Sequence, residues 1–242
     1  MSMNYLENTP YDLIYYLFNK LNHSNRFELL IAFDFLSERK YFEAMFRGRH
    51  EVILGLIERK EVERIRSLDL VKDPTPEQKE DYILNALYTD HVPMVELILD
   101  KFAVDLGGAA LNRAFQFYLE SGIGSREIIS TIIGNKNVDV NSKLNILTYR
   151  RLGEIMSEKD ALELVKKIKM DLDDMEQILR KYPYKDKSKL LSYFVENYEE
   201  FKTNEKYSKT LIKLVIRCPE TGNLPESIKL LDILYPYRLK FI

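Results

Sequence analysis

The 242-residue sequence contains one cysteine, Cys218, and no tryptophan. A single cysteine cannot form an internal disulfide, so the sequence fits a reducing compartment, and a free cysteine usually packs as a small hydrophobic residue. There is no apolar run of the ~20 residues that a membrane-spanning helix needs. The first ten residues, MSMNYLENTP, lack the basic start and apolar core of a signal peptide. We therefore expect a cytoplasmic protein with no membrane partner.

An excess of charge of one sign is also missing. Lys and Arg number 36 and Asp and Glu number 38, which leaves a formal net charge of −2. A field this weak attracts neither nucleic acid nor an anionic surface. Nucleic acid is therefore not an expected partner.

Motifs that carry catalysis or bind metals are missing as well. No His/Cys cluster has zinc spacing, and neither a phosphate-binding loop nor a Gly-x-Ser-x-Gly nucleophile motif is present. The acidic run at 171–176 lacks the glycine and the later glutamate of a calcium loop, and is typical of a helix start. We predict a non-enzymatic protein without metal or cofactor.

What the chain does contain is a series of short amphipathic helices. Between Asp81 and Asp105 two of them follow each other, each with apolar residues at i, i+3 and i+4. Neither is long enough to be stable alone in water, so we expect the pair to pack against similar pairs. No alternating polar and apolar run is bounded by turns, so no sheet is expected. The predicted fold class is all-α.

One apolar pattern recurs along the chain: two adjacent apolar residues, two spacers and two more apolar residues. It occurs at Val52-Ile53-Leu56-Ile57, Met94-Val95-Ile98-Leu99, Ile128-Ile129-Ile132-Ile133 and Leu211-Ile212-Val215-Ile216. The second and third copies lie 34 residues apart, and Val104-Asp105 and Val138-Asp139 follow them at equal distances. Such recurrence on separate helices is typical of a helical-repeat array.

Residues 47–141 resemble degenerate ankyrin repeats. The segments that are similar to the first helix of that repeat, with its small alanine, are Asn85-Ala86-Leu87 and Asn112-Arg113-Ala114-Phe115. His91 to Leu99 resembles the turn and second helix, and His50 takes the same place as His91, where the resemblance implies a structural role in the turn. The Thr-Pro-Leu-His tetrapeptide is missing, and Gly107-Gly108 leaves a short link instead of a hairpin. The resemblance implies a helical-repeat (ankyrin-like) solenoid that binds proteins.

Residues 1–46 are predicted to form an N-terminal helical module. The segment from Thr9 to Leu21 begins with a capping residue and a proline, and it resembles the first helix of an F-box. Thr9 stands where that family has leucine, and the family's tryptophan is absent. The resemblance implies an adaptor that docks on a Skp-type subunit of a cullin-type ubiquitin ligase through Pro10, Leu13, Ile14, Leu17 and Leu21. The same apolar face equally suits a cap that seals the array.

Residues 142–242 are predicted to form further helical hairpins and a C-terminal cap, with helices at 171–181, 188–201, 207–217 and 226–234. Thr75 and Ser157 are expected N-caps. The chain as a whole predicts a protein–protein interaction module, which is either a substrate-recruiting adaptor or a scaffold or inhibitor with no ubiquitin-ligase link. F-box-like and ankyrin-like modules in one chain resemble proteins of large DNA viruses, which implies the host cytoplasm.

Overall fold

The computed structural model of the protein describes residues 20, 47–67, 74–184, 187–217 and 224–238. Within these ranges the secondary structure is helical throughout, with no strand, which confirms the predicted all-α class. The predicted helical module at 1–46 and the docking residues in it lie outside the described ranges, which contain only Lys20 of that segment. Among the described helices, none has the length and apolar character needed to cross a bilayer.

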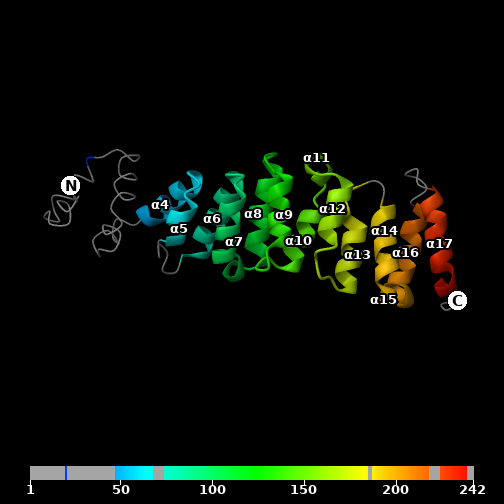
Figure 1. The fold of residues 1–242 in the computed structure, drawn as a ribbon. Coiled ribbons are helices and arrows are strands. Elements are labelled where there is room, and N and C mark those ends of the chain that lie inside the picture. The colour runs from blue at the N-terminus through cyan, green and yellow to red at the C-terminus, as the bar shows by residue number, and fades with distance from the viewer. Residues whose placement is uncertain (1–19, 21–46, 68–73, 185–186, 218–223, 239–242) are drawn as a thin grey trace.

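The helices follow one another in an elongated row (Figure 1). In chain order they are α4 (Arg47–Glu58), α5 (Val62–Ser67), α6 (Pro76–Tyr88), α7 (Val92–Leu106), α8 (Gly108–Glu120), α9 (Arg126–Gly134), α10 (Val140–Leu147), α11 (Leu152–Ile155), α12 (Glu158–Val165), α13 (Leu172–Lys181), α14 (Ser188–Asn197), α15 (Glu199–Thr203), α16 (Glu205–Arg217) and α17 (Leu224–Arg238).

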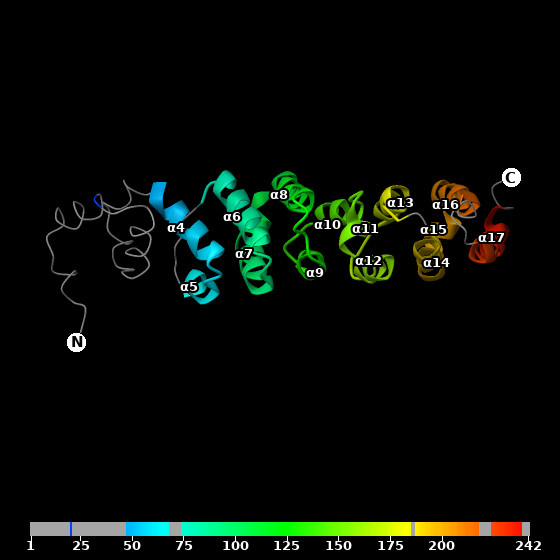
Figure 2. The ribbon, with the colours of Figure 1, turned by 90° about the horizontal axis from the view of Figure 1, so that it is seen from above.

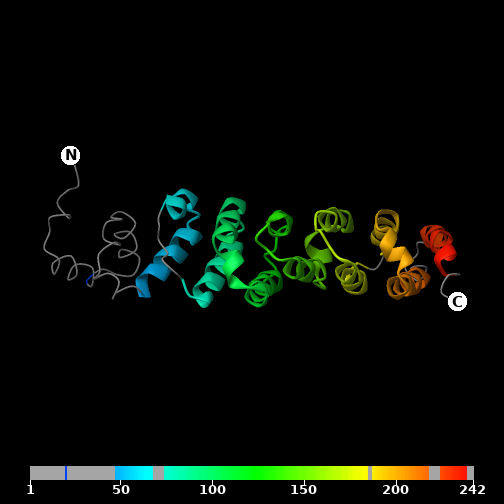
Figure 3. The same cartoon turned by 90° about the horizontal axis from the view of Figure 1, so that it is seen from below.

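The row has two layers, which Figures 2 and 3 show from opposite sides. In the first layer α4, α6, α8, α10, α13 and α16 each contact the next helix in this order. The second layer contains α5, α7, α9, α12, α14 and α17. The short helices α11 and α15 lie in the connections. The chain therefore alternates between the layers as it advances along the row.

Local capping groups determine where several of these helices begin. Thr75 Oγ1 accepts a hydrogen bond from Gln78 N while the Gln78 side chain accepts one from Thr75 N, which closes a capping box at α6. Asp171 and Asp174 form the same reciprocal pair at α13, so the acidic run is a helix start, as predicted. Single side-chain caps begin α9, α10 and α12 at Ser125, Asp139 and Ser157. The predicted caps Thr75 and Ser157 are confirmed.

The recurring apolar pattern lies in the core. All four of its residues are buried in α7 and in α9, as the sequence predicted. The same pattern occurs in α14 at Leu190, Leu191, Phe194 and Val195, each 0% exposed, which sequence reasoning missed. In α16 Leu211 and Val215 are buried, whereas Ile216 is 55% exposed, so the fourth copy of the pattern lies only partly in the core.

The predicted equivalence of α4 with α7 is also wrong. α4 packs against α6 in the first layer, whereas α7 belongs to the second layer. His50 lies within α4 itself. Its Nε2 is 3.3 Å from Asp81 Oδ2, and its ring centroid is 5.1 Å from that of Tyr82. His91 is the N-cap residue of α7, but its side chain makes no capping hydrogen bond. The two histidines occupy different places in the fold.

Several predicted boundaries also differ from those in the structure. α7 continues to Leu106 and Val104 is 67% exposed, while Val138 is buried directly before Asp139, the N-cap residue of α10. The two Val-Asp pairs are therefore not equivalent. The helix predicted at 188–201 is broken at Tyr198, whose φ of −128° and ψ of 92° are extended. The short helix α5 was not predicted.

Candidate interaction surface

The predicted docking residues Pro10, Leu13, Ile14, Leu17 and Leu21 lie outside the described residues, and the candidate surface lies on the helical row. Across the described ranges no group of three or more His, Cys, Asp or Glu side chains could hold a metal ion. Two hollows in the described part of the surface lie between neighbouring helices of the second layer, one in each half of the row.

The first hollow, which we name the α7–α9 groove, has a volume of about 510 Å³. One wall is the outer side of α7, and the other is α9 with the turn that follows it. The lining residues are Glu96, Asp100, Ser130, Thr131, Gly134, Asn135 and Lys136.

Burial of the apolar pattern positions these polar residues. Because Val95, Ile98 and Leu99 face the core, Glu96 and Asp100, one helical turn apart, face solvent on the opposite side of α7. Asp100 Oδ1 then accepts hydrogen bonds from the side-chain amides of Asn135, at 3.0 Å, and Asn137, at 3.3 Å. These bonds hold the turn after α9 against the neighbouring helix.

The second hollow, the α12–α14 groove, has a volume of about 590 Å³. It is lined by Leu162, Lys166, Ser188, Lys189, Ser192, Tyr193, Glu196 and Asn197. Lys166 Nζ lies 5.7 Å from the centroid of the Tyr193 ring, within the range of a cation–π contact. Burial in the groove raises the pKa of Tyr193 to about 12, so this phenol stays neutral at physiological pH.

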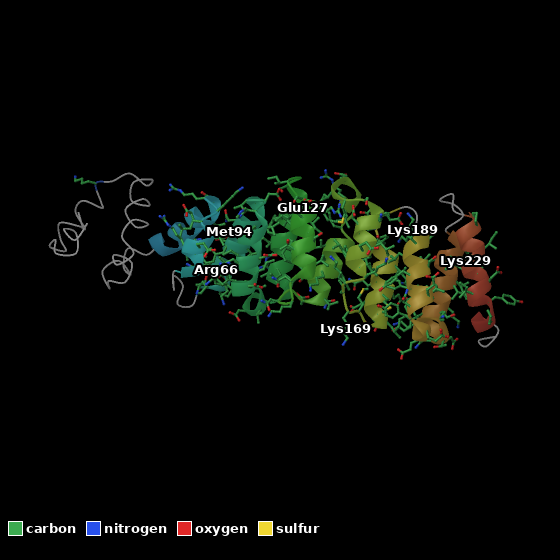
Figure 4. The ribbon with its side chains drawn as sticks, viewed as in Figure 1. Arg66, Met94, Glu127, Lys169, Lys189 and Lys229 are labelled. Carbon is green, nitrogen blue, oxygen red and sulfur yellow. The ribbon has the colours of Figure 1, made fainter. Side chains whose placement is uncertain are left out.

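Each charged side chain that lines the α12–α14 groove already has an ion-pair partner. Lys166 Nζ lies 2.7 Å from Glu163 Oε1, and Lys189 Nζ lies 3.5 Å from Glu158 Oε2. Glu196 Oε1 lies 3.7 Å from Nζ of Lys229 on α17; Lys189 and Lys229 are labelled in Figure 4. The charges of this groove are thus balanced within the protein.

Polar contacts across the joints of the first layer hold consecutive helices in register. Arg113 of α8 binds both carboxylate oxygens of Glu80 on α6, at 3.0 and 2.6 Å. At the joint of α13 and α16, Lys206 Nζ and the Tyr207 hydroxyl donate to Asp173 Oδ1 at 2.6 and 2.7 Å. These two hydrogen bonds, led by that of Lys206, lower the pKa of Asp173, so its carboxylate is ionised at neutral pH.

Side-chain hydrogen bonds also join the turns that connect the two layers. Ser125 Oγ donates to Asp90 Oδ1 at 2.5 Å, and Ser125 N donates to the Tyr118 hydroxyl at 3.0 Å. The Tyr184 hydroxyl donates to the carbonyl of Met156 at 2.8 Å, and burial raises the pKa of Tyr184 to about 12. These tyrosines serve as neutral hydrogen-bonding groups that fix the turns.

The comparisons with known proteins returned no match: no family model, no curated protein and no solved structure is similar to this chain. The sequence patterns also did not predict the grooves. The buried pattern of α7 does indicate which of its residues face outward, including Glu96 and Asp100. Which outward residues border a hollow depends on the neighbouring helix, and that helix is identified only by the packing.

Proposed function

We propose that the chain is a non-enzymatic protein–protein interaction module built as a degenerate, ankyrin-like array of helix pairs. The observation that carries the proposal is the two-layer row, in which each first-layer helix contacts the helix one pair further along the chain. Such arrays bury a continuous core between neighbouring units and present an extended surface to macromolecular partners.

The sequence separation of residues that form hydrogen bonds between helix pairs supports the repeat array. Side-chain hydrogen bonds join Arg113 to Glu80 and Lys206 to Asp173, and each pair is 33 residues apart. The Thr210 hydroxyl donates to Glu176 across 34 residues, and Asn135 donates to Asp100 across 35. One structural unit therefore corresponds to about 33 residues, close to the length of an ankyrin repeat. A near-neutral net charge favours protein partners over nucleic acid.

For the N-terminal segment we propose the adaptor role over the cap, on the strength of its F-box resemblance. Pro10, Leu13, Ile14, Leu17 and Leu21 would then contact a Skp-type subunit of a cytoplasmic cullin ligase, and the helical row would hold the target. The scaffold or inhibitor without a ligase link differs from this proposal only in the N-terminal contact. One experiment can therefore separate the two.

The experiment is affinity purification of the full chain from cells, followed by mass spectrometry. We expect a Skp-type subunit and at least one further protein to co-elute with the wild-type chain. Leu17→Asp should remove the Skp-type subunit and retain the other protein, because it places a charge on the docking face and leaves the row unchanged. Circular dichroism of both chains serves as the folding control.

The outcomes distinguish the proposals. Retention of the target without a Skp-type subunit by the wild-type chain would support the scaffold and contradict the adaptor. Elution of the wild-type chain without any stoichiometric protein partner would contradict the interaction module itself.

A further inference from the structure

We propose that the α7–α9 groove is a docking site for a short segment of a partner protein that carries a basic side chain next to an acidic one. This inference rests on the proposed function and identifies a surface and a partner chemistry for it. The basic side chain would face Glu96 and Asp100, and the acidic one would face Lys136. The groove of about 510 Å³ brings all three together.

The charges of this groove are available, unlike those of the α12–α14 groove. Neither Glu96 nor Lys136 has an ion-pair or hydrogen-bond partner within the described part of the chain, and both are exposed. The groove therefore presents a carboxylate from α7 and an ammonium group from the turn after α9, with no internal partner for either. A segment with the opposite charges would complement both.

Asp100 adds a fixed acceptor beside Glu96. The hydrogen bonds from Asn135 and Asn137 reach its Oδ1, and no described contact involves its Oδ2. Two amide donors hold this carboxylate in place before a ligand arrives, which lowers the ordering cost of binding. The parallel donors of an arginine guanidinium suit carboxylate oxygens in such a fixed position.

The opposite wall lets a polypeptide approach closely. Gly134 lines the groove, and a Cβ atom placed on it would meet no heavy atom within 4 Å. No side chain therefore covers the backbone at the end of α9. The Ser130 side chain, one turn earlier, makes no described hydrogen bond and can donate to a carbonyl of a bound segment. The groove thus combines charge selectivity on one wall with access to main chain on the other.

The test uses a phage-displayed library of random twelve-residue peptides selected on the immobilised full chain. Selected peptides should be enriched in adjacent basic and acidic residues. Fluorescence polarisation with the synthesised peptides should then show binding weakened by roughly three- to tenfold by Glu96→Lys and by Lys136→Glu. The matched controls are Asp232→Lys on α17 and Lys169→Glu, which reverse exposed charges outside the groove and should leave binding unchanged.

A charge-swapped peptide tests the assigned contact. Replacing the selected basic residue by glutamate should weaken binding to the wild-type chain, and Glu96→Lys should recover part of this loss, since Asp100 remains beside the new lysine. The inference is overturned if no charged peptide is enriched, or if the groove and control variants bind alike. If the groove variants still retain the cellular partners found by affinity purification, the groove assignment fails while the interaction module stands.

Discussion

Ala86 and Ala114 are buried in consecutive first-layer helices, α6 and α8, which contact each other. The ankyrin resemblance implied a small first-helix alanine at both positions, where a small side chain leaves room for a neighbouring helix. Capping residues were predictable for a similar reason, since Thr75 and Ser157 act on the backbone only three residues ahead. Residue-level prediction succeeds where the interaction is local or depends on size alone.

We predict that Ala114→Leu destabilises the protein by about 1–3 kcal/mol, because extra methyl groups at a position with 0% exposure force neighbouring helices apart. Ala109→Leu is the matched control, as Ala109 lies on the exposed side of the same helix and should change the free energy of unfolding by less than about 0.5 kcal/mol. Urea denaturation followed by circular dichroism measures both. Equal effects of the two substitutions would contradict the proposed close packing.

At the scale of helices, the sequence indicated which residues are buried but not where each helix packs. The apolar pattern of α4 resembles that of α7, because both follow the i, i+4 geometry of one buried helix face. The two helices nevertheless lie in different layers, and this difference arises from long-range packing. Short helices such as α5, with six residues, were missed because so few residues give no clear period and depend on tertiary contacts.

Gly107, the single-residue link between α7 and α8, gives an element-scale prediction. Its φ of 76° and ψ of 152° fall in a region that is essentially restricted to glycine. We expect Gly107→Ala to cost about 1–3 kcal/mol of stability. Gly134→Ala is the control, because a Cβ there meets nothing within 4 Å and the alanine should be neutral or stabilising by up to about 1 kcal/mol. Thermal unfolding measures both variants. A lower melting temperature for Gly134→Ala than for Gly107→Ala would contradict the backbone strain expected at residue 107.

At the scale of the whole molecule, the row forms because each helix pair contacts the next pair in the chain. The all-α class could be predicted, because the amphipathic period of a helix is a property of the sequence itself. The grooves could not, since each is formed by two helices whose facing sides are set only when the pairs stack. The candidate site is therefore a property of the assembled row.

The most direct test of this stacking is zero-length cross-linking of lysines to carboxylates in the full chain with a carbodiimide, followed by peptide mass spectrometry. The structure predicts cross-links between residues 26 to 33 positions apart: Lys79 with Asp105, Lys189 with Glu158, Lys206 with Asp173 and Lys229 with Glu196. The last three of these links join one helix pair to the next and would demonstrate the stacking, whereas the link of Lys79 with Asp105 joins the two helices of one pair. Intramolecular links that instead join segments separated by 60 residues or more, about two unit lengths, would show a chain that folds back on itself and would contradict the account.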